Sequence, residues 1–368
     1  MGRRTILSKY CCQHLISRYS QRTSAEIRQV YLSRTHKNLK LVDKANGGKA
    51  DAINAGLNVC HSPLFCCIDA DSVLERESLV RIVQPFLNHP ETIAVGGAIR
   101  IANGCTVKNG HIISRGVPSN FLAIFQMVEY LRAFLFGRVA WARMEGSLIV
   151  SGAFGLFRKS TVIEAGGYAT DTIGEDMELI LRMYRTMIKK KAPFRVEFIP
   201  DTVCWTEAPE SLKVFASQRR RWHRGLSESL TLNRSLLFAR GSGTIGWVAF
   251  PFFILFEWLS PFVELVGYLF TAYLLILGKL SILDASIIFI FAIQLSVFLS
   301  VVSLLLDEFT FPGTTSMKGM LVLILFAFLE SFGYRQLNMF YKIQGVIAWL
   351  RNSKHKWGEM TRTGNWQK

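Results

Sequence analysis

Two carboxylates separated by one residue, Asp69 and Asp71, directly follow an apolar run, Leu64–Ile68. The run predicts a buried strand, and in an open α/β sheet the carboxyl ends of strands are where ligands bind. Hard oxygen ligands at such a place suit Mg²⁺ or Mn²⁺, which in turn suit a diphosphate. Because Asp-x-Asp is a common sequence, a loop or a helix cap explains this motif taken alone equally well.

Two glycine-containing segments could bring backbone close to a bound anion or sugar. The first, residues 46–49, reads Asn-Gly-Gly-Lys and precedes a predicted helix over residues 50–59. Its free N–H groups and the charge of Lys49 suit a phosphate, although a plain helix start is an equal alternative. The second, residues 151–155, reads Ser-Gly-Ala-Phe-Gly, and its small residues suit either a bulky ligand or close packing.

Two further groups of side chains suit a transfer reaction. Glu175 and Asp176 open a predicted helix, where a carboxylate could act as a general base, although the helix dipole alone also favours acids there. Gln218, Arg221 and Trp222 lie on one predicted helix. Arginine forms paired hydrogen bonds to phosphate oxygens and tryptophan can stack on a sugar face. A basic amphipathic helix on a membrane surface is the alternative.

Alternating strands and helices would position these residues. The pattern predicts strands over residues 39–43, 64–71, 92–102, 148–157 and 195–200. It predicts helices over residues 50–59, 75–87, 121–141, 175–187 and 212–236. Such alternation indicates an α/β domain with a parallel sheet. We assign residues 1–240 to this α/β domain.

The rest of the chain is dominated by large apolar residues. Residues 285–306, about 22 in number, carry no charge and are long enough to span a bilayer as a helix. Residues 247–278 predict an interfacial segment followed by a span, and residues 320–350 form a third, less uniform block. We therefore assign residues 244–350 to a membrane region with interfacial and transmembrane helices, and residues 351–368 to a basic tail.

The net charge of +16 gathers beside the apolar blocks, at residues 219–224 and 351–356. Basic residues that flank spans mark the cytoplasmic side, so the α/β domain and the C-terminus are both expected inside. This requires an even number of spans, so the first or the last of the three blocks would be split or only interfacial. No basic stripe with interleaved aromatics accompanies the charge, which argues against nucleic acid. The seven cysteines lack zinc spacing and suit reduced, buried thiols.

Taken together and in this order, the motifs resemble those of the processive family-2 glycosyltransferases, which include cellulose, hyaluronan and poly-N-acetylglucosamine synthases. The motifs are Asn-Gly-Gly-Lys49, Asp69-x-Asp71, Glu175-Asp176 and Gln218-x-x-Arg221-Trp222. The resemblance implies a GT-A-like, Rossmann-type α/β domain followed by membrane helices. It implies a membrane-bound inverting β-glycosyltransferase that extends a polysaccharide from a UDP-sugar donor with Mg²⁺ or Mn²⁺.

The resemblance also implies roles for individual residues. Asp176 would be the catalytic base, supported by Glu175, and Asp71 would bind the metal. Lys49, Asp69 and Arg221 would bind the donor, while Gln218 and Trp222 would hold the acceptor sugar. The implied partners are a nucleotide-sugar donor, a polysaccharide or sugar acceptor, the lipid bilayer, and export or accessory subunits. The implied location is the cell (plasma or inner) membrane, crossed several times, with a cytoplasmic catalytic domain.

One departure from the family concerns the beginning of the chain. The family has an earlier strand that ends in an Asp-rich turn for uridine, whereas no aspartate precedes Asp43 here. The expectation is therefore a GT-A-like domain whose first strands are missing. Two alternatives follow: a catalytically inactive remnant or subunit of such an enzyme, or a non-processive family-2 transferase that acts on a lipid carrier. The Gln218-x-x-Arg221-Trp222 segment argues against the second alternative.

Overall fold

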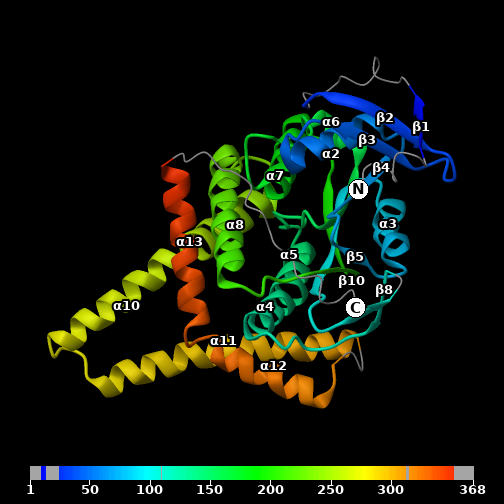
Figure 1. Cartoon of the computed structure of the whole chain (residues 1–368). Coiled ribbons are helices and arrows are strands. Elements are labelled where there is room, and N and C mark those ends of the chain that lie inside the picture. Colours follow the sequence, from blue (N-terminus) through cyan, green and yellow to red (C-terminus); the bar gives the residue numbers. More distant parts are fainter. Residues whose placement is uncertain (1–9, 14–24, 109, 312–314, 352–368) are drawn as a thin grey trace.

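The structure is a computed structural model that describes residues 10–13, 25–108, 110–311 and 315–351. An α/β body carries helices that extend away from it, as Figure 1 shows. The predicted basic tail lies outside the described residues apart from Arg351, and so does much of the segment before Asp43. The expectation of missing first strands therefore stays a prediction.

A five-stranded mixed sheet forms the centre of the body, in the order β4–β9–β6–β10–β5. Strand β9 runs antiparallel to both β4 and β6, β10 runs parallel to β6, and β5 runs antiparallel to β10. The strands are β4 (Leu64–Ile68), β5 (Val73–Leu74), β6 (Thr92–Ile101), β9 (Phe154–Arg158) and β10 (Arg195–Thr206). The expected parallel sheet is thus wrong. Strands β4, β6 and β10 do share one direction, but β9 arrives from later in the chain and inserts between β4 and β6.

Two other strand predictions need correction. The predicted strand at residues 39–43 forms as β3 (Lys40–Lys44), but it pairs with β2 (Ile27–Ser33) in a separate antiparallel sheet that also contains β1 (Tyr10–Gln13). The predicted strand at residues 148–157 begins only at Phe154. The reason is that Gly152 bonds through its N–H and C=O to side chains of two helices, not to a neighbouring strand.

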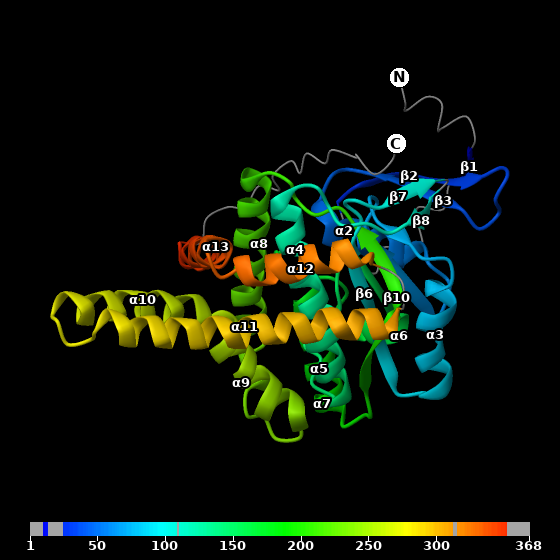
Figure 2. The same ribbon diagram turned by 90° about the horizontal axis from the view of Figure 1, so that it is seen from below.

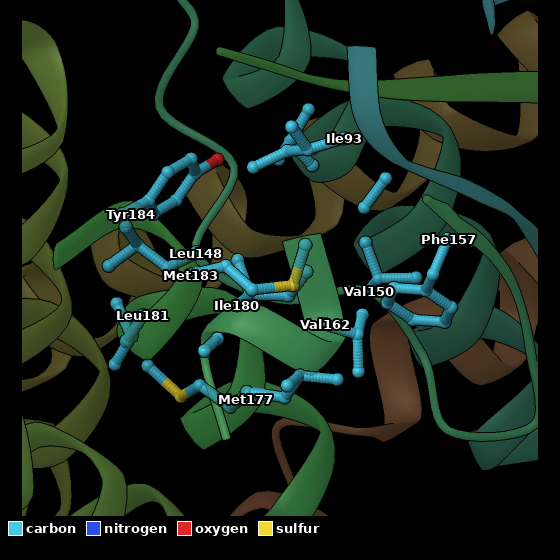
Figure 3. Packing of buried hydrophobic residues seen from close by; sticks show 14 of the residues in the cluster. Ile93, Leu148, Val150, Phe157, Val162, Met177, Ile180, Leu181, Met183 and Tyr184 are labelled. Carbon is cyan, nitrogen blue, oxygen red and sulfur yellow. The ribbon is translucent and has the colours of Figure 1, made fainter. Parts of the chain in front are cut away.

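Helices cover both faces of the central sheet, and all ten residues of β6 are buried as a result. One face packs against α2 (Gly48–Val59), α6 (Lys159–Glu164) and α7 (Glu175–Lys190), and the other packs against α3 (Ser78–Asn88). Figure 3 shows how the apolar residues of α7 pack against Ile93, Leu148 and Val150. This core fixes the start of α7 relative to the edge of the sheet.

A long helix over residues 121–143 confirms the helix predicted at residues 121–141. It consists of α4 (Phe121–Leu131), a π-helical segment η2 (Arg132–Arg138) and α5 (Val139–Arg143). Asn120 caps its start, because its side chain accepts hydrogen bonds from the N–H groups of Leu122 and Ala123. A short hairpin of β7 (Thr106–Lys108) and β8 (His111–Ser114) precedes it.

The C-terminal part is helical and largely apolar. One helix, α11 (Ile282–Thr310), is long and apolar enough to cross a membrane, as the sequence predicts. Two pairs of helices, each bent at a short break, are further candidates if each pair forms a single span. They are Ile245–Trp258 with α10 (Ser260–Ile276), and α12 (Met317–Leu329) with α13 (Tyr334–Leu350). Figures 1 and 2 show α10 and the first part of α11 extending away from the body and joining at their far ends. Among the described residues there are thus one to three candidate spans, and the parity stays a prediction.

Charged contacts join the α/β domain to these helices. Arg100 of β6 pairs with Asp307 of α11, and Arg132 of η2 lies 2.5 Å from Glu330 at the end of α12. Below them, apolar residues of α4 pack against Leu304, Leu323 and Phe326. Figure 1 shows α11 and α12 passing beneath α4, and in Figure 2, which is seen from below, they cross in front of it. The long helix of residues 121–143 is therefore held between the sheet and the apolar helices.

Helix α8 (Leu212–Leu232) confirms most of the predicted basic helix, which ends at a short 3₁₀ turn. Helix α13 packs along it, and a Cβ atom at Gly345 would lie 2.6 Å from the carbonyl oxygen of Arg220. The glycine therefore permits the close approach of the two helices. The second half of the last apolar block thus lies against the α/β domain, next to α8 (Figure 1).

Candidate functional site

The inserted strand β9 brings residues 151–153 to the carboxyl end of β4. Ile68, the last residue of β4, pairs with Phe154, the first residue of β9. Because the two strands are antiparallel, the residues just before β9 lie beside those just after β4. The N–H of Asp69 accordingly points to the carbonyl oxygen of Ala153 at 3.4 Å. One predicted motif is thereby placed beside another.

Lys49 connects three segments at this edge. Its Nζ lies 2.6 Å from Oδ1 of Asp69 and 3.9 Å from Oε1 of Glu175, and it donates a 2.9 Å hydrogen bond to the carbonyl oxygen of Gly152. Burial lowers the pKa of Lys49, but the attraction of the two carboxylates is greater, so the pKa lies above its usual value. The lysine therefore carries a permanent positive charge at the start of α2.

Asp176 is held by backbone N–H groups. Its Oδ2 accepts a 3.1 Å hydrogen bond from the N–H of Gly152, and its Oδ1 accepts one of 2.8 Å from the N–H of Met177. A Cβ atom at Gly152 would lie 3.1 Å from Nζ of Lys49 and 3.3 Å from Oδ2 of Asp176. The missing side chain thus lets the lysine and the carboxylate approach the same backbone segment from two sides.

Glu175 is buried, with only 8% of its surface exposed. Burial and the neighbouring charge of Asp176 raise its pKa to about 7, against the opposing attraction of Lys49 and Arg221. The structure therefore brings five of the eight predicted site residues close enough to interact electrostatically. They are Lys49, Asp69, Glu175, Asp176 and Arg221. A buried carboxyl group whose pKa is raised toward neutrality beside a second carboxyl group is typical of functional sites.

Glycines set the position of α8 and hence of Arg221. A Cβ atom at Gly174 would lie 2.6 Å from the carbonyl oxygen of Gly225, so the start of α7 and the middle of α8 touch through backbone. Glu228 strengthens this contact, because its Oε2 accepts hydrogen bonds from the N–H of Ile173 and from the hydroxyl of Thr172. The role of Glu228 could not be predicted from the sequence, because nothing in the local pattern indicates a partner about 55 residues earlier.

The other three predicted site residues lie farther along the same elements. Asp71 is half-buried after β4, near Cys204 of β10, whose thiol pKa rises to about 12 mainly through burial, with contributions from Asp69 and Asp71. Gln218 is buried. Trp222 is 42% exposed, and it contacts Arg219 at 4.6 Å and Tyr130 at 6.3 Å from its ring centroid. The exposed tryptophan leaves an aromatic surface on α8 that an acceptor sugar could contact.

The oxygen ligands here fit a divalent ion only with help from a substrate. Among the described residues, no three His, Cys, Asp or Glu side chains are grouped to hold a metal. Mg²⁺ and ions like it are, however, commonly held by one or two carboxylates together with substrate phosphates and water. Asp71, which follows Asp69 by two residues on this turn, is the carboxylate that the sequence predicts as the metal ligand, and Asp69 pairs with Lys49.

The raised pKa of Glu175 leads to a prediction about stability. A carboxyl whose folded pKa, about 7, exceeds its ordinary value of 4.5 binds its proton more tightly in the folded state. Stability is then highest at low pH and falls as pH rises from 4.5 to 7. Glu175→Gln removes this cost, so we expect it to stabilise the fold at pH 8 by on the order of 2–3 kcal/mol, and much less at pH 5. Thermal unfolding at both pH values measures this.

The matched control is Glu164→Gln, because Glu164 is an exposed carboxylate that pairs with Lys190 on the surface. Surface ion pairs contribute little, so its melting temperature should change little at either pH. A Glu175→Gln variant that is destabilised equally at pH 5 and pH 8 would contradict the prediction.

Comparison with known proteins gives three findings. The profile described as glycosyl transferase family group 2 matches residues 64–306, more than half of the chain. Two curated relatives are poly-beta-1,6-N-acetyl-D-glucosamine synthases, from Staphylococcus aureus (strain COL) and Staphylococcus epidermidis. Each is 28% identical over 219 residues, which are 59% of this chain and 47% of the relative. The chain thus spans about half the length of the curated relatives it matches.

A solved mannosyltransferase from Pyrobaculum calidifontis, in complex with GDP-Man and Mn²⁺, aligns with a TM-score of 0.46 and 17% identity. The alignment covers 83% of this chain and 68% of that one.

Proposed function

The chain belongs to glycosyl transferase family group 2, and on that premise we propose that it is a membrane-bound inverting β-glycosyltransferase. It transfers sugar units from a UDP-sugar to a growing polysaccharide. Its α/β domain has the GT-A-like fold of the family, with a mixed sheet, followed by a helical region with at least one apolar helix. The observation that carries the proposal is the contact of Lys49, Asp69, Gly152 and Asp176 at one edge of that sheet.

The arrangement suits the two requirements of inverting transfer. A base must take the proton from the acceptor hydroxyl on one side of the sugar, and positive charge must stabilise the UDP that leaves on the other. Asp176, held by two N–H groups, is the base, and its neighbour Glu175 supports it. Lys49 and Arg221 supply positive charge to the diphosphate, and Asp69 orients Lys49.

The acceptor and the metal complete the proposal. Gln218 and the exposed Trp222 hold the acceptor sugar next to the base. Asp71 would hold Mg²⁺ or Mn²⁺, and the bound ion would supply Lewis-acid stabilisation of the leaving diphosphate. The names of the relatives indicate UDP-N-acetylglucosamine as the first donor to test. We place the enzyme in the cell (plasma or inner) membrane, with a cytoplasmic α/β domain and with export or accessory subunits as further partners.

The experiment uses the full chain in lipid nanodiscs with labelled UDP-N-acetylglucosamine, UDP-glucose and UDP-glucuronic acid, each with Mn²⁺ or Mg²⁺. We expect label in a high-molecular-weight product from UDP-N-acetylglucosamine, and loss of that product when EDTA is added. Calorimetry with UDP and Mn²⁺ accompanies it. No incorporation from any donor would overturn the proposal; micromolar UDP binding would then favour an inactive remnant or subunit. Transfer of one sugar to an extractable lipid would favour a non-processive transferase.

A further inference from the structure

Arg138, the last residue of the π-helical segment η2, lies next to the candidate site, although no motif includes it. Its Nη1 donates a 2.9 Å hydrogen bond to the carbonyl oxygen of Ile149, and its guanidinium carbon lies 4.6 Å from the ring centroid of Phe134. The bonded carbonyl belongs to the segment that runs to Gly152 without strand pairing. The Arg138 side chain therefore supplies the hydrogen bond to the Ile149 carbonyl that a neighbouring strand would supply in a sheet.

The segment of residues 149–152 leads directly to the proposed base. Val150 is buried in the main core and fixes the middle of the segment. Gly152 then donates its N–H to Asp176 and accepts a hydrogen bond from Lys49. The position of the Gly152 N–H, and with it one hydrogen bond of the carboxylate, depends on how well residue 149 is held.

The positive charge of Arg138 would be unnecessary if its side chain only filled space between the helix and the sheet. In the described part of the chain it forms no ion pair with a carboxylate, and the electrostatic attractions that raise its pKa come from Asp176, Glu257 and Tyr130. Burial lowers the pKa of Arg138 to about 10, so it is still a cation at neutral pH. Arg138 is half-buried, and taking a charge even partly out of water is costly, so an apolar residue would serve packing alone better.

The other end of η2 is also anchored. Arg132 lies 2.5 Å from Glu330 and also bonds to Ser300, so the first residue of the segment is fixed to the apolar helices. A π-helical turn is rare, and it occurs most often as an interruption of α-helices at functional sites. Here it is the part of the long helix that carries both arginines.

We propose that Arg138 is a positioning residue for the glycosyltransferase reaction: it fixes the backbone of residues 149–152, which holds Asp176, and places a positive charge near that carboxylate. This inference rests on the proposed function. It extends the site to a helix that contacts the sheet on one side and the apolar helices on the other.

The test compares Arg138→Gln and Arg138→Lys with the unchanged full chain in nanodiscs. If the residue only positions the base, Arg138→Gln should lower kcat by about 10- to 100-fold, because small misplacements of a catalytic group cost up to that much. The KM for the UDP-sugar should change by less than about 3-fold, since Lys49 and Asp69 are untouched. Arg138→Lys keeps the charge and one donor, and should recover part of kcat.

Hydrogen–deuterium exchange provides a readout that needs no activity. Peptides that cover residues 147–155 should exchange about 10-fold faster or more in Arg138→Gln, because the segment loses the hydrogen bond at Ile149 that fixes it and so holds the Gly152 N–H less firmly against Asp176. The control is Arg143→Gln, five residues later in the same helix and exposed, which should leave both kinetics and exchange unchanged.

The possible results distinguish a chain that lacks the proposed activity from one in which Arg138 has no positioning role. An inactive parent chain with faster exchange in Arg138→Gln would overturn the proposed function and keep the structural role of Arg138. Unchanged exchange in Arg138→Gln would overturn the positioning role. A rise in KM for donor or acceptor with kcat unchanged would also overturn it, because it would show that Arg138 contacts the substrate.

Discussion

An Asp176→Asn variant is expected to lose polymer synthesis by about 10²- to 10⁴-fold, which is the usual contribution of a general base. Asparagine has nearly the same size and can still accept a hydrogen bond from the N–H of Gly152 or Met177. It cannot take a proton from a hydroxyl at neutral pH. The loss should therefore appear in kcat, measured as labelled polymer formed per minute at saturating donor.

Donor binding should survive this substitution, because Lys49 bonds to Asp69 and Gly152 and not to Asp176. UDP affinity measured by calorimetry should change by less than about 3-fold. Asp171→Asn is the matched control, since Asp171 lies five residues earlier and is exposed; its activity should equal that of the unchanged chain. Equal synthesis by Asp176→Asn and the parent chain would refute the assignment of the base.

Asp71→Asn is expected to have the second-largest effect, a fall in synthesis of at least about 100-fold, because charge stabilisation of a leaving group is worth several kcal/mol. An amide oxygen is a weaker ligand for a hard cation than a carboxylate oxygen. The variant should also lose most of the dependence of UDP affinity on Mn²⁺. Calorimetric titration with UDP, with and without Mn²⁺, measures this separately from catalysis.

The control for this prediction is Asp201→Asn. Asp201 is an exposed carboxylate of β10 that pairs with Arg81, so its loss should change neither synthesis nor the effect of Mn²⁺. If Asp71→Asn still binds UDP more tightly with Mn²⁺ than without it, the metal site lies elsewhere. In that case Asp69 would be the next carboxylate to substitute.

Several features of the fold could be predicted from the sequence because they depend on local patterns. Apolar runs with turn residues at their ends predicted the strands that became β4 and β6. Periodic apolar residues predicted α7 and α8, and the length of the uncharged block predicted α11. The family resemblance rested on motifs within short segments, and the profile match confirms the family.

The sheet order could not be predicted in the same way. Alternation of strands and helices indicates parallel neighbours, and β4, β6 and β10 do share a direction. Strand β9, however, follows a long helix and inserts between β4 and β6. It pairs with both of them and keeps them from pairing with each other. No local pattern in residues 154–158 specifies this insertion, because both pairings depend on residues about 60 to 90 positions earlier.

By itself, the sequence determined which residue types this protein places at strand ends and helix starts, and how much of the chain is apolar enough for a membrane. Only the tertiary structure decided that Lys49 meets Gly152, 103 residues later, and that Arg138 bonds to the carbonyl of Ile149, three residues before Gly152. The physical reason is that helix and strand formation follow from neighbouring residues. Convergence of side chains depends on packing between segments, and no single segment encodes that packing.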